Sequence, residues 1–235
     1  MAGSLLPCLF PLQEETLVRL RGVKRIPGCG LIEGSGSKGA LVISSNPSLV
    51  LQAALTPADA GHSVVVVMGG DRWTALPPTF HRMPRPSPAA MASIRFWYPA
   101  NLTELIQLIY REDVVARTVV VSDADILVRR SVGGLIGGSK VFLKTFARLS
   151  AILHSYLASC LGDDCAGSPM ANLVVFSSFS EEEEVEVSEK ASLWYQEVWK
   201  EEAKATRNQL ISVPQDITIS YYLSEGSYYM QGLEL

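Results

Sequence analysis

Cysteine and histidine are scarce in this chain of 235 residues. The cysteines are scattered rather than spaced as a disulfide framework, which fits a reducing compartment; they are Cys8, Cys29, Cys160 and Cys165. The histidines, His62, His81 and His154, have no metal-ligand spacing with them. A structural zinc site needs more ligands than the pair Cys160 and Cys165 supplies. We therefore expect no metal centre.

Long apolar runs and an excess of positive charge are also absent. No apolar segment approaches the ~20 residues that span a bilayer. Residues 5–12 are apolar but few, and no positive leader precedes them, so we do not expect a signal peptide. The formal net charge of -4 gives no general attraction to nucleic acid or to an anionic membrane. We expect a soluble intracellular protein without membrane contact, in which any contact with nucleic acid comes from a local basic patch.

The composition is that of an ordinary globular domain, with 48% hydrophobic and 19% charged residues. The length suits one large α/β domain better than two. Glycine and serine crowd residues 34–39, which predicts a flexible linker. We therefore divide the chain into an N-terminal extension, residues 1–39, and a core domain, residues 40–235.

Hydrophobic patterning predicts strands that alternate with helices. The uninterrupted β-branched run at residues 63–68 is typical of a strand buried on both faces. Further strands are predicted at 40–45, 94–98, 118–121, 173–179, 211–213, 217–223 and 228–233, and helices at 48–55, 102–111, 141–161 and 188–206. The last two strands would form a hairpin at Glu225-Gly226. This order predicts an α/β fold: a mostly parallel sheet flanked by helices, with a C-terminal antiparallel hairpin.

The turn after the first strand is where ligands bind in parallel α/β folds. A working phosphate-binding loop needs Gly-x-x-x-x-Gly-Lys-Ser/Thr, because its amides wrap the phosphates and its lysine reaches their charge. The turn here has no glycine and no lysine, and its proline removes one donor; it consists of Ser44, Ser45, Asn46, Pro47 and Ser48. Ser48 alone could imitate the hydroxyl, and Lys38 precedes the strand. We interpret the turn as a nucleotide-loop relic.

The strand predicted at residues 118–121 is followed by Ser122 and Asp123. β-branched residues followed by a carboxylate are typical of a Walker B strand, whose Asp holds Mg²⁺. Alternatively, Asp123 and Asp125 merely end the strand and cap the segment after it.

Residues 94–109 (IRFWYPANLTELIQLI) resemble the strand, Tyr-Pro step and helix of the small recombinase-paralogue ATPase that associates with a SWIM-type zinc-finger protein. Residues 50–55 (VLQAAL) resemble the helix that follows the phosphate-binding loop of that family. Asp123 falls in the Walker B place, and Asp164-Cys165 precede the next strand. The similarity covers roughly residues 40–233.

The resemblance implies a RecA-like fold and a subunit of an animal Shu complex. With its SWIM partner, that complex supports assembly of recombinase filaments on single-stranded DNA during homologous recombination, which implies a nuclear protein. Family members carry Gly-Lys-Thr in the loop, and this chain does not. Where active recombinases place a catalytic glutamate after the second strand, this chain offers Asp71. We therefore expect neither ATP nor Mg²⁺ as a cofactor and no catalytic residues.

Recombinases place a DNA-contacting loop between the Walker B strand and the next helix, which corresponds here to residues 129–140 (RRSVGGLIGGSK). Its glycines would let amides approach phosphates. The candidate DNA-binding residues are the cations of this loop and of the helix face that continues it, Arg129, Arg130, Lys140, Lys144 and Arg148. The alternative is a mobile loop beside a solvated helix face. The second DNA loop would fall at residues 180–186, an acidic stretch that we expect to be a solvated loop or a surface for a basic partner.

The sequence supports three functional hypotheses. The first is a recombinase-like subunit that pairs with a SWIM protein, without catalysis. The second is an ATPase with an unusual loop, using Ser48 and Asp123 around Mg²⁺. The third is a scaffold without a DNA role. Three aromatic residues, Trp194, Tyr195 and Trp199, are predicted to share one helix, where they would form core or a partner interface.

Overall fold

The computed structural model describes residues 38–71, 86–112, 114–133, 138–161, 172–204, 207–212, 218–224 and 227–234. Within these ranges one nine-stranded sheet has the order β3-β2-β4-β5-β1-β6-β7-β8-β9. The strands are β1 (Lys38–Ile43), β2 (Val64–Met68), β3 (Ile94–Trp97), β4 (Thr118–Ser122), β5 (Asn172–Ser177), β6 (Glu197–Lys204), β7 (Arg207–Ser212), β8 (Thr218–Ser224) and β9 (Ser227–Glu234).

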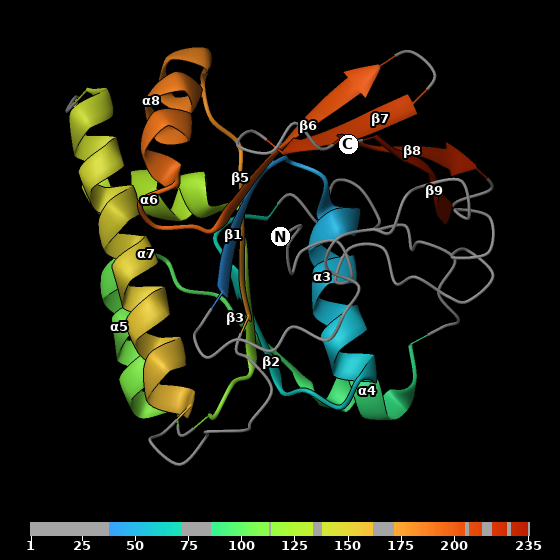
Figure 1. Cartoon of the computed structure of the whole chain (residues 1–235). Helices are drawn as coiled ribbons and strands as arrows, with labels where there is room; N and C mark the ends of the chain where they lie inside the picture. The colour runs from blue at the N-terminus through green and yellow to red at the C-terminus, as the bar shows by residue number, and fades with distance from the viewer. Residues whose placement is uncertain are drawn as a thin grey trace.

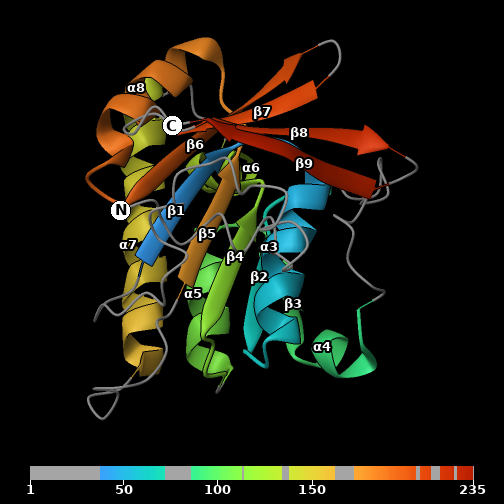
Figure 2. The same cartoon turned by 45° about the vertical axis from the view of Figure 1, so that its right-hand side comes forward.

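The sheet has a parallel part and an antiparallel part. Strands β3, β2, β4, β5, β1 and β6 pair in parallel, and β6 to β9 pair antiparallel. The antiparallel strands β7 to β9, which we call the tail, lie across the end of the sheet at which α3 begins (Figures 1 and 2). The predicted mostly parallel sheet with antiparallel C-terminal strands is confirmed.

Helices cover both faces of the sheet (Figure 1). One face carries α3 (Pro47–Asp59) and α4 (Pro88–Ala92), and the other carries α5 (Leu102–Arg111), α6 (Ala124–Val132), α7 (Ser139–Leu161) and α8 (Glu181–Ala191). All five residues of β2 are buried, as its valine run predicts. Two hydrophobic cores result, one under α3 and one under α5 to α8. No described helix is long and apolar enough to cross a membrane.

Several helix boundaries follow from local capping. Asn101 caps α5 by accepting a hydrogen bond from the Glu104 amide at 3.0 Å. Ser180 and Glu183 form a complete capping box at the start of α8. The acidic stretch 180–186 was therefore wrongly predicted to be a loop: it begins a helix.

The region 188–206 was also predicted wrongly. Helix α8 ends at Ala191, and the following segment forms β6 instead of continuing the helix. The reason is tertiary: β6 pairs in parallel with β1 and antiparallel with β7, which no local pattern of helix-forming residues reveals. Trp199 lies on β6 in the core under α3, whereas Tyr195 packs in the opposite core, so these aromatics share no helix.

The predicted glycine-rich loop at 129–140 is helical at both of its described ends. Helix α6 extends to Val132, so Arg129 and Arg130 are helical residues, and α7 begins at Ser139. The first strand begins at Lys38, which places that lysine in β1 instead of in a linker. Residues 1–37, the 225–226 turn, His81, Asp164-Cys165 and the cysteines other than Cys160 lie outside the described residues.

Candidate functional site

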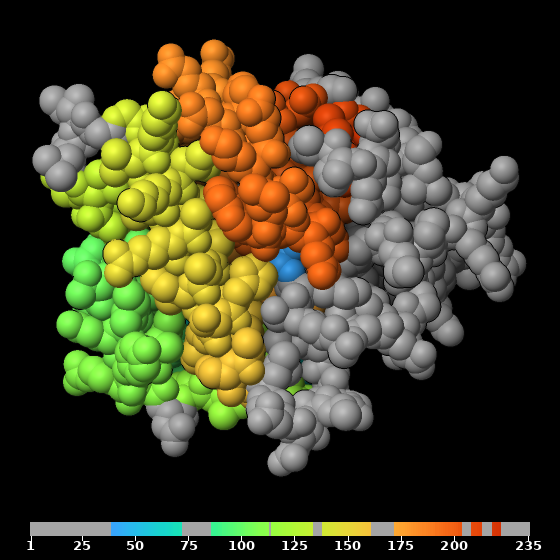
Figure 3. All heavy atoms as spheres, turned by 60° about the vertical axis from the view of Figure 1, so that its left-hand side comes forward, coloured from blue at the N-terminus to red at the C-terminus, as the bar shows by residue number. Residues whose placement is uncertain are grey.

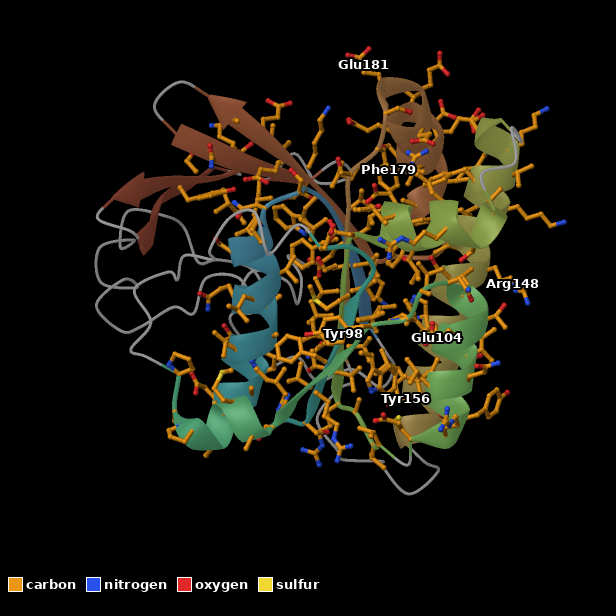
Figure 4. All side chains as sticks on the ribbon, turned by 180° about the vertical axis from the view of Figure 1, so that it is seen from behind. Tyr98, Glu104, Arg148, Tyr156, Phe179 and Glu181 are labelled. Atoms are coloured by element: carbon orange, nitrogen blue, oxygen red, sulfur yellow. The ribbon has the colours of Figure 1, made fainter. Side chains whose placement is uncertain are left out.

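Residues 44–47 of the β1–α3 turn line an open cleft of about 500 Å³ at the carboxyl ends of β1, β5 and β6. Its walls come from the β1–α3 turn, from Ser178 and Phe179 after β5, from Glu184 of α8, and from Lys200 and Glu201 of β6. Phe179 lies between α8 and the sheet in Figure 4. A cleft at this end of parallel strands is where α/β folds bind ligands.

The backbone donors of the turn are satisfied by the turn itself. The Asn46 amide donates to Ser44 Oγ at 3.0 Å, and the Ser48 amide donates to Asn46 Oδ1 at 3.1 Å. Pro47 has no amide proton, and it occupies the first turn of α3. The amides that would cradle a phosphate in a glycine-rich loop are therefore engaged by side chains.

Glu201 lies at the centre of this network. Its carboxylate accepts hydrogen bonds from Ser44 Oγ, from Asn46 Nδ2 at 3.2 Å and from the Tyr221 hydroxyl of β8. Tyr221 is fully buried, so its hydroxyl needs a hydrogen-bond partner. Glu201 thus joins the β1–α3 turn to the tail.

The charges on the cleft walls disfavour a triphosphate. Lys200 forms an ion pair with Glu184. The hydrogen bond that Lys200 donates to Glu184 raises the pKa of Lys200; burial partly opposes this shift, and the charges of Glu202 and Glu181 raise the pKa further. The charged residues that line the cleft are two carboxylates, Glu184 and Glu201, and one lysine, Lys200. Chemically, the cleft suits a neutral or cationic group better than a polyanion.

Asp123 is held in the left-handed conformation, φ 53°, ψ 47°, at the start of α6. It is 5% exposed, and its Oδ2 accepts from Ser122 Oγ at 3.0 Å. A Cβ added to Gly70, after β2, would lie 3.1 Å from that same Oδ2. Asp123 therefore borders the end of β2, and β5 lies between its strand, β4, and β1.

Neither Asp123 nor Ser48 belongs to the cleft lining. Asp71, the other candidate carboxylate, is exposed.

Asp125 ties the same region to β5. Its amide donates to Ser177 Oγ at 3.1 Å, and its Oδ1 accepts from the Ser178 amide at 3.1 Å. Asp125 is 4% exposed, so this carboxylate is a buried structural link rather than a group open to a ligand.

Arg129 and Arg130 contact the protein itself. Arg129 donates to Glu183 at 2.5 Å, and its guanidinium lies 5.0 Å from the centre of the Phe142 ring. Burial raises the pKa of Glu183, but hydrogen bonds from Arg129 and Ser180 outweigh burial and lower it overall. Arg130 donates to the Gly69 carbonyl at 3.1 Å. Both arginines therefore help to fix α6.

The remaining candidates for DNA binding form an exposed row on α7. Lys140, Lys144 and Arg148 are exposed and four residues apart, so they share one face of the helix. Within the described part of the chain none of them forms an ion pair. Figure 3 shows α7 between α5 and α8 on an open face, and Figure 4 places Arg148 on the outer side of the helical layer, away from Glu181 at the tip of α8.

Sequence reasoning missed Glu201, Tyr221 and Glu183. Glu201 fell in a segment predicted to be helical, so its place beside the turn could not be inferred. The Ser180–Glu183 spacing was a usable signal, because it matches a capping box. Among the residues with described positions, no cluster of His, Cys, Asp or Glu could hold a metal ion.

The strand order, the parallel sheet between helical layers and the cleft at the start of α3 define a RecA-like fold. The structure of the RadB recombinase is similar, with a TM-score of 0.53 and 12% identity, over 81% of this chain and 89% of that chain. The flagellar accessory protein FlaH from Methanocaldococcus jannaschii gives a TM-score of 0.48 and 9% identity, over 84% of this chain and 89% of that chain. No protein-family model and no curated protein matches the sequence.

Proposed function

We propose that this protein is a non-catalytic, recombinase-paralogue-like subunit of a Shu-type complex. It pairs with a SWIM-type zinc-finger protein in the nucleus and promotes recombinase filament assembly on single-stranded DNA. The RecA-like fold and the resemblance of residues 94–109 support the assignment. The observation that carries the non-catalytic part is Glu201, which engages Ser44 and Asn46 in the turn where a nucleotide phosphate would need donors.

Contact with single-stranded DNA is assigned to the α7 row, Lys140, Lys144 and Arg148. Exposed cations at one-turn spacing can follow a phosphate backbone without reading its sequence. Arg129 and Arg130 contribute less directly, because they are held by Glu183 and by the Gly69 carbonyl. They keep α6 in place beside the row.

Partner binding is tested by co-expression with a SWIM-type zinc-finger protein. We expect the two chains to purify together as a heterodimer and to stimulate recombinase loading on single-stranded DNA. A chain that is monodisperse, stable alone and indifferent to such a partner would contradict the assignment.

DNA contact is tested by replacing Lys140, Lys144 and Arg148 together with alanine. Each phosphate contact on a single strand contributes about -0.7 to the slope of log affinity against log salt, so the slope should become shallower by roughly 2. The matched control replaces the exposed cations Arg95, Arg111 and Arg117, which lie on other elements. If both triple variants lose affinity equally, or neither does, the α7 row is not the DNA contact.

Nucleotide binding is tested by titration with Mg-ATP. We expect no saturable binding by the wild-type protein. Tight binding that disappears in Asp123→Ala would instead establish an ATPase-type site with an unusual loop.

A further inference from the structure

Glu201 occupies a position at which α/β proteins commonly bind a small anion. The first turn of a helix presents a partial positive charge, and α3 begins directly beside the cleft. The side chains that supply donors at this point, Ser44 and Asn46, both donate to the Glu201 carboxylate. A carboxylate from β6 therefore stands where an external anion would bind.

Within the described residues, the Glu201 carboxylate is held by hydrogen bonds and not by a neighbouring cation. Lys200 precedes it on β6, and successive strand residues point to opposite faces. Lys200 accordingly forms its ion pair with Glu184. The three donors to Glu201 come from Ser44, Asn46 and Tyr221. Several hydrogen bonds to one carboxylate are how proteins hold an anion without a counter-charge.

We propose that Glu201 is an internal ligand of an oxyanion site formed by the side chains of Ser44, Asn46 and Tyr221, beside the start of α3. When the Glu201 side chain is removed, this site accepts a free carboxylate or phosphate ion. In the wild-type protein the Glu201 carboxylate occupies the site. Its hydrogen bonds therefore connect the tail to the β1–α3 turn without any bound ligand. The inference extends the proposed function but depends on neither the partner nor DNA, so either can fail alone.

The experiment is chemical rescue of Glu201→Ala, followed by thermal unfolding at constant ionic strength. We expect Glu201→Ala to lower the Tm by roughly 5 °C, because three donors lose a charged acceptor. Sodium acetate or sodium phosphate, replacing sodium chloride, should then raise the Tm of this variant by about 2 °C or more. The two salts distinguish a carboxylate site from a phosphate site.

Two controls separate a specific site from a general salt effect. Glu202→Ala removes the next carboxylate on β6, which takes no part in the hydrogen bonds to the turn, and it should respond to acetate as the wild-type protein does. Glu201→Gln keeps the volume of the side chain, so it should lose stability but show no rescue. The proposal is overturned if Glu201→Ala is as stable as wild type, or if acetate and phosphate raise all four Tm values equally.

If Glu201→Ala does not fold, the comparison moves to the amide variants. Glu201→Gln should then have a lower Tm than Glu202→Gln by several degrees, because only the former loses the anion held by the turn. Equal Tm values for these two variants would also overturn the proposal.

Discussion

Glu183 links α6 to α8 through a single carboxylate, and its ionisation should make stability depend on pH. Burial raises its pKa, but hydrogen bonds from Arg129 and Ser180 prevail, so the net shift is downward from 4.5. A lowered folded-state pKa means stabilisation that is complete above the unfolded value and is lost as the pH falls through the folded value. We expect Glu183→Gln to lower the free energy of unfolding by about 1–2 kcal/mol near neutral pH, since Arg129 is half exposed.

Urea unfolding at several pH values tests this effect of Glu183. The difference between wild type and Glu183→Gln should shrink as the pH falls below 4.5. Glu189→Gln, on the exposed face of the same helix, should match wild type throughout. A stability gap for Glu183→Gln that stays constant with pH would assign the effect to helix capping alone.

Gly69 marks a point where two backbones come too close for any side chain. Its amide donates to the Ser122 carbonyl at 2.8 Å, and an added Cβ would lie 2.3 Å from the carbonyl oxygen of Asp123. Because the obstructing atom belongs to the backbone, Gly69→Ala must displace the end of β4, and we expect a loss of at least about 2 kcal/mol in unfolding free energy. Gly138→Ala, with open space around its Cβ, should cost nothing measurable in the same denaturation assay. Equal stability of the two variants would contradict this geometry.

Helix α7 has one buried face and one exposed face. Its inner face carries an apolar stripe, in which Phe146, Leu149 and Leu157 are all fully buried. Its outer face carries Lys144 and Arg148. We expect Leu149→Ala to lower the unfolding free energy by about 3 kcal/mol, whereas Lys144→Ala should change it by less than about 0.5 kcal/mol. Thermal unfolding of both variants checks this, and a large loss in Lys144→Ala would mean that the outer row is structural and that its DNA assay needs another interpretation.

The elements that could be predicted from sequence are those whose signal is local. Strand β2 is a valine run, α5 begins at an asparagine cap, and α7 has a long apolar stripe; each lies where it was predicted. Strand β6 could not be predicted, because its residues alternate poorly and become a strand only by pairing with β1 and β7. The turn between the first strand and its helix lies where it was predicted, but its carboxylate partner could not be inferred, because Glu201 belongs to the strand β6 that the sequence did not reveal.

Across the whole molecule, the tail belongs to the core instead of forming an appendage. Leu210, Ile219 and Tyr221 of the tail are buried in the same hydrophobic cluster as residues of α3. The sheet is continuous from β3 to β9, and β1 is paired on both sides, by β5 and β6. A bound ligand is therefore not needed to hold the tail against the core, because both apolar burial and the hydrogen bonds of Glu201 stabilise its position.

Because the sheet and its core are continuous, we expect the tail and the parallel strands to open together. Amides that are protected only by local structure exchange through partial opening, whereas amides within one cooperative unit exchange at the global free energy of unfolding. We expect hydrogen exchange to give the same opening free energy for β7 and β8 as for β2 and β4 in the wild-type protein. In Glu201→Ala the tail amides should exchange through a lower-energy opening, while β2 and β4 stay at the global value. If the wild-type tail already exchanges faster than the parallel strands, the tail is a separate unit, and the hydrogen bonds of Glu201 do not couple it to the turn.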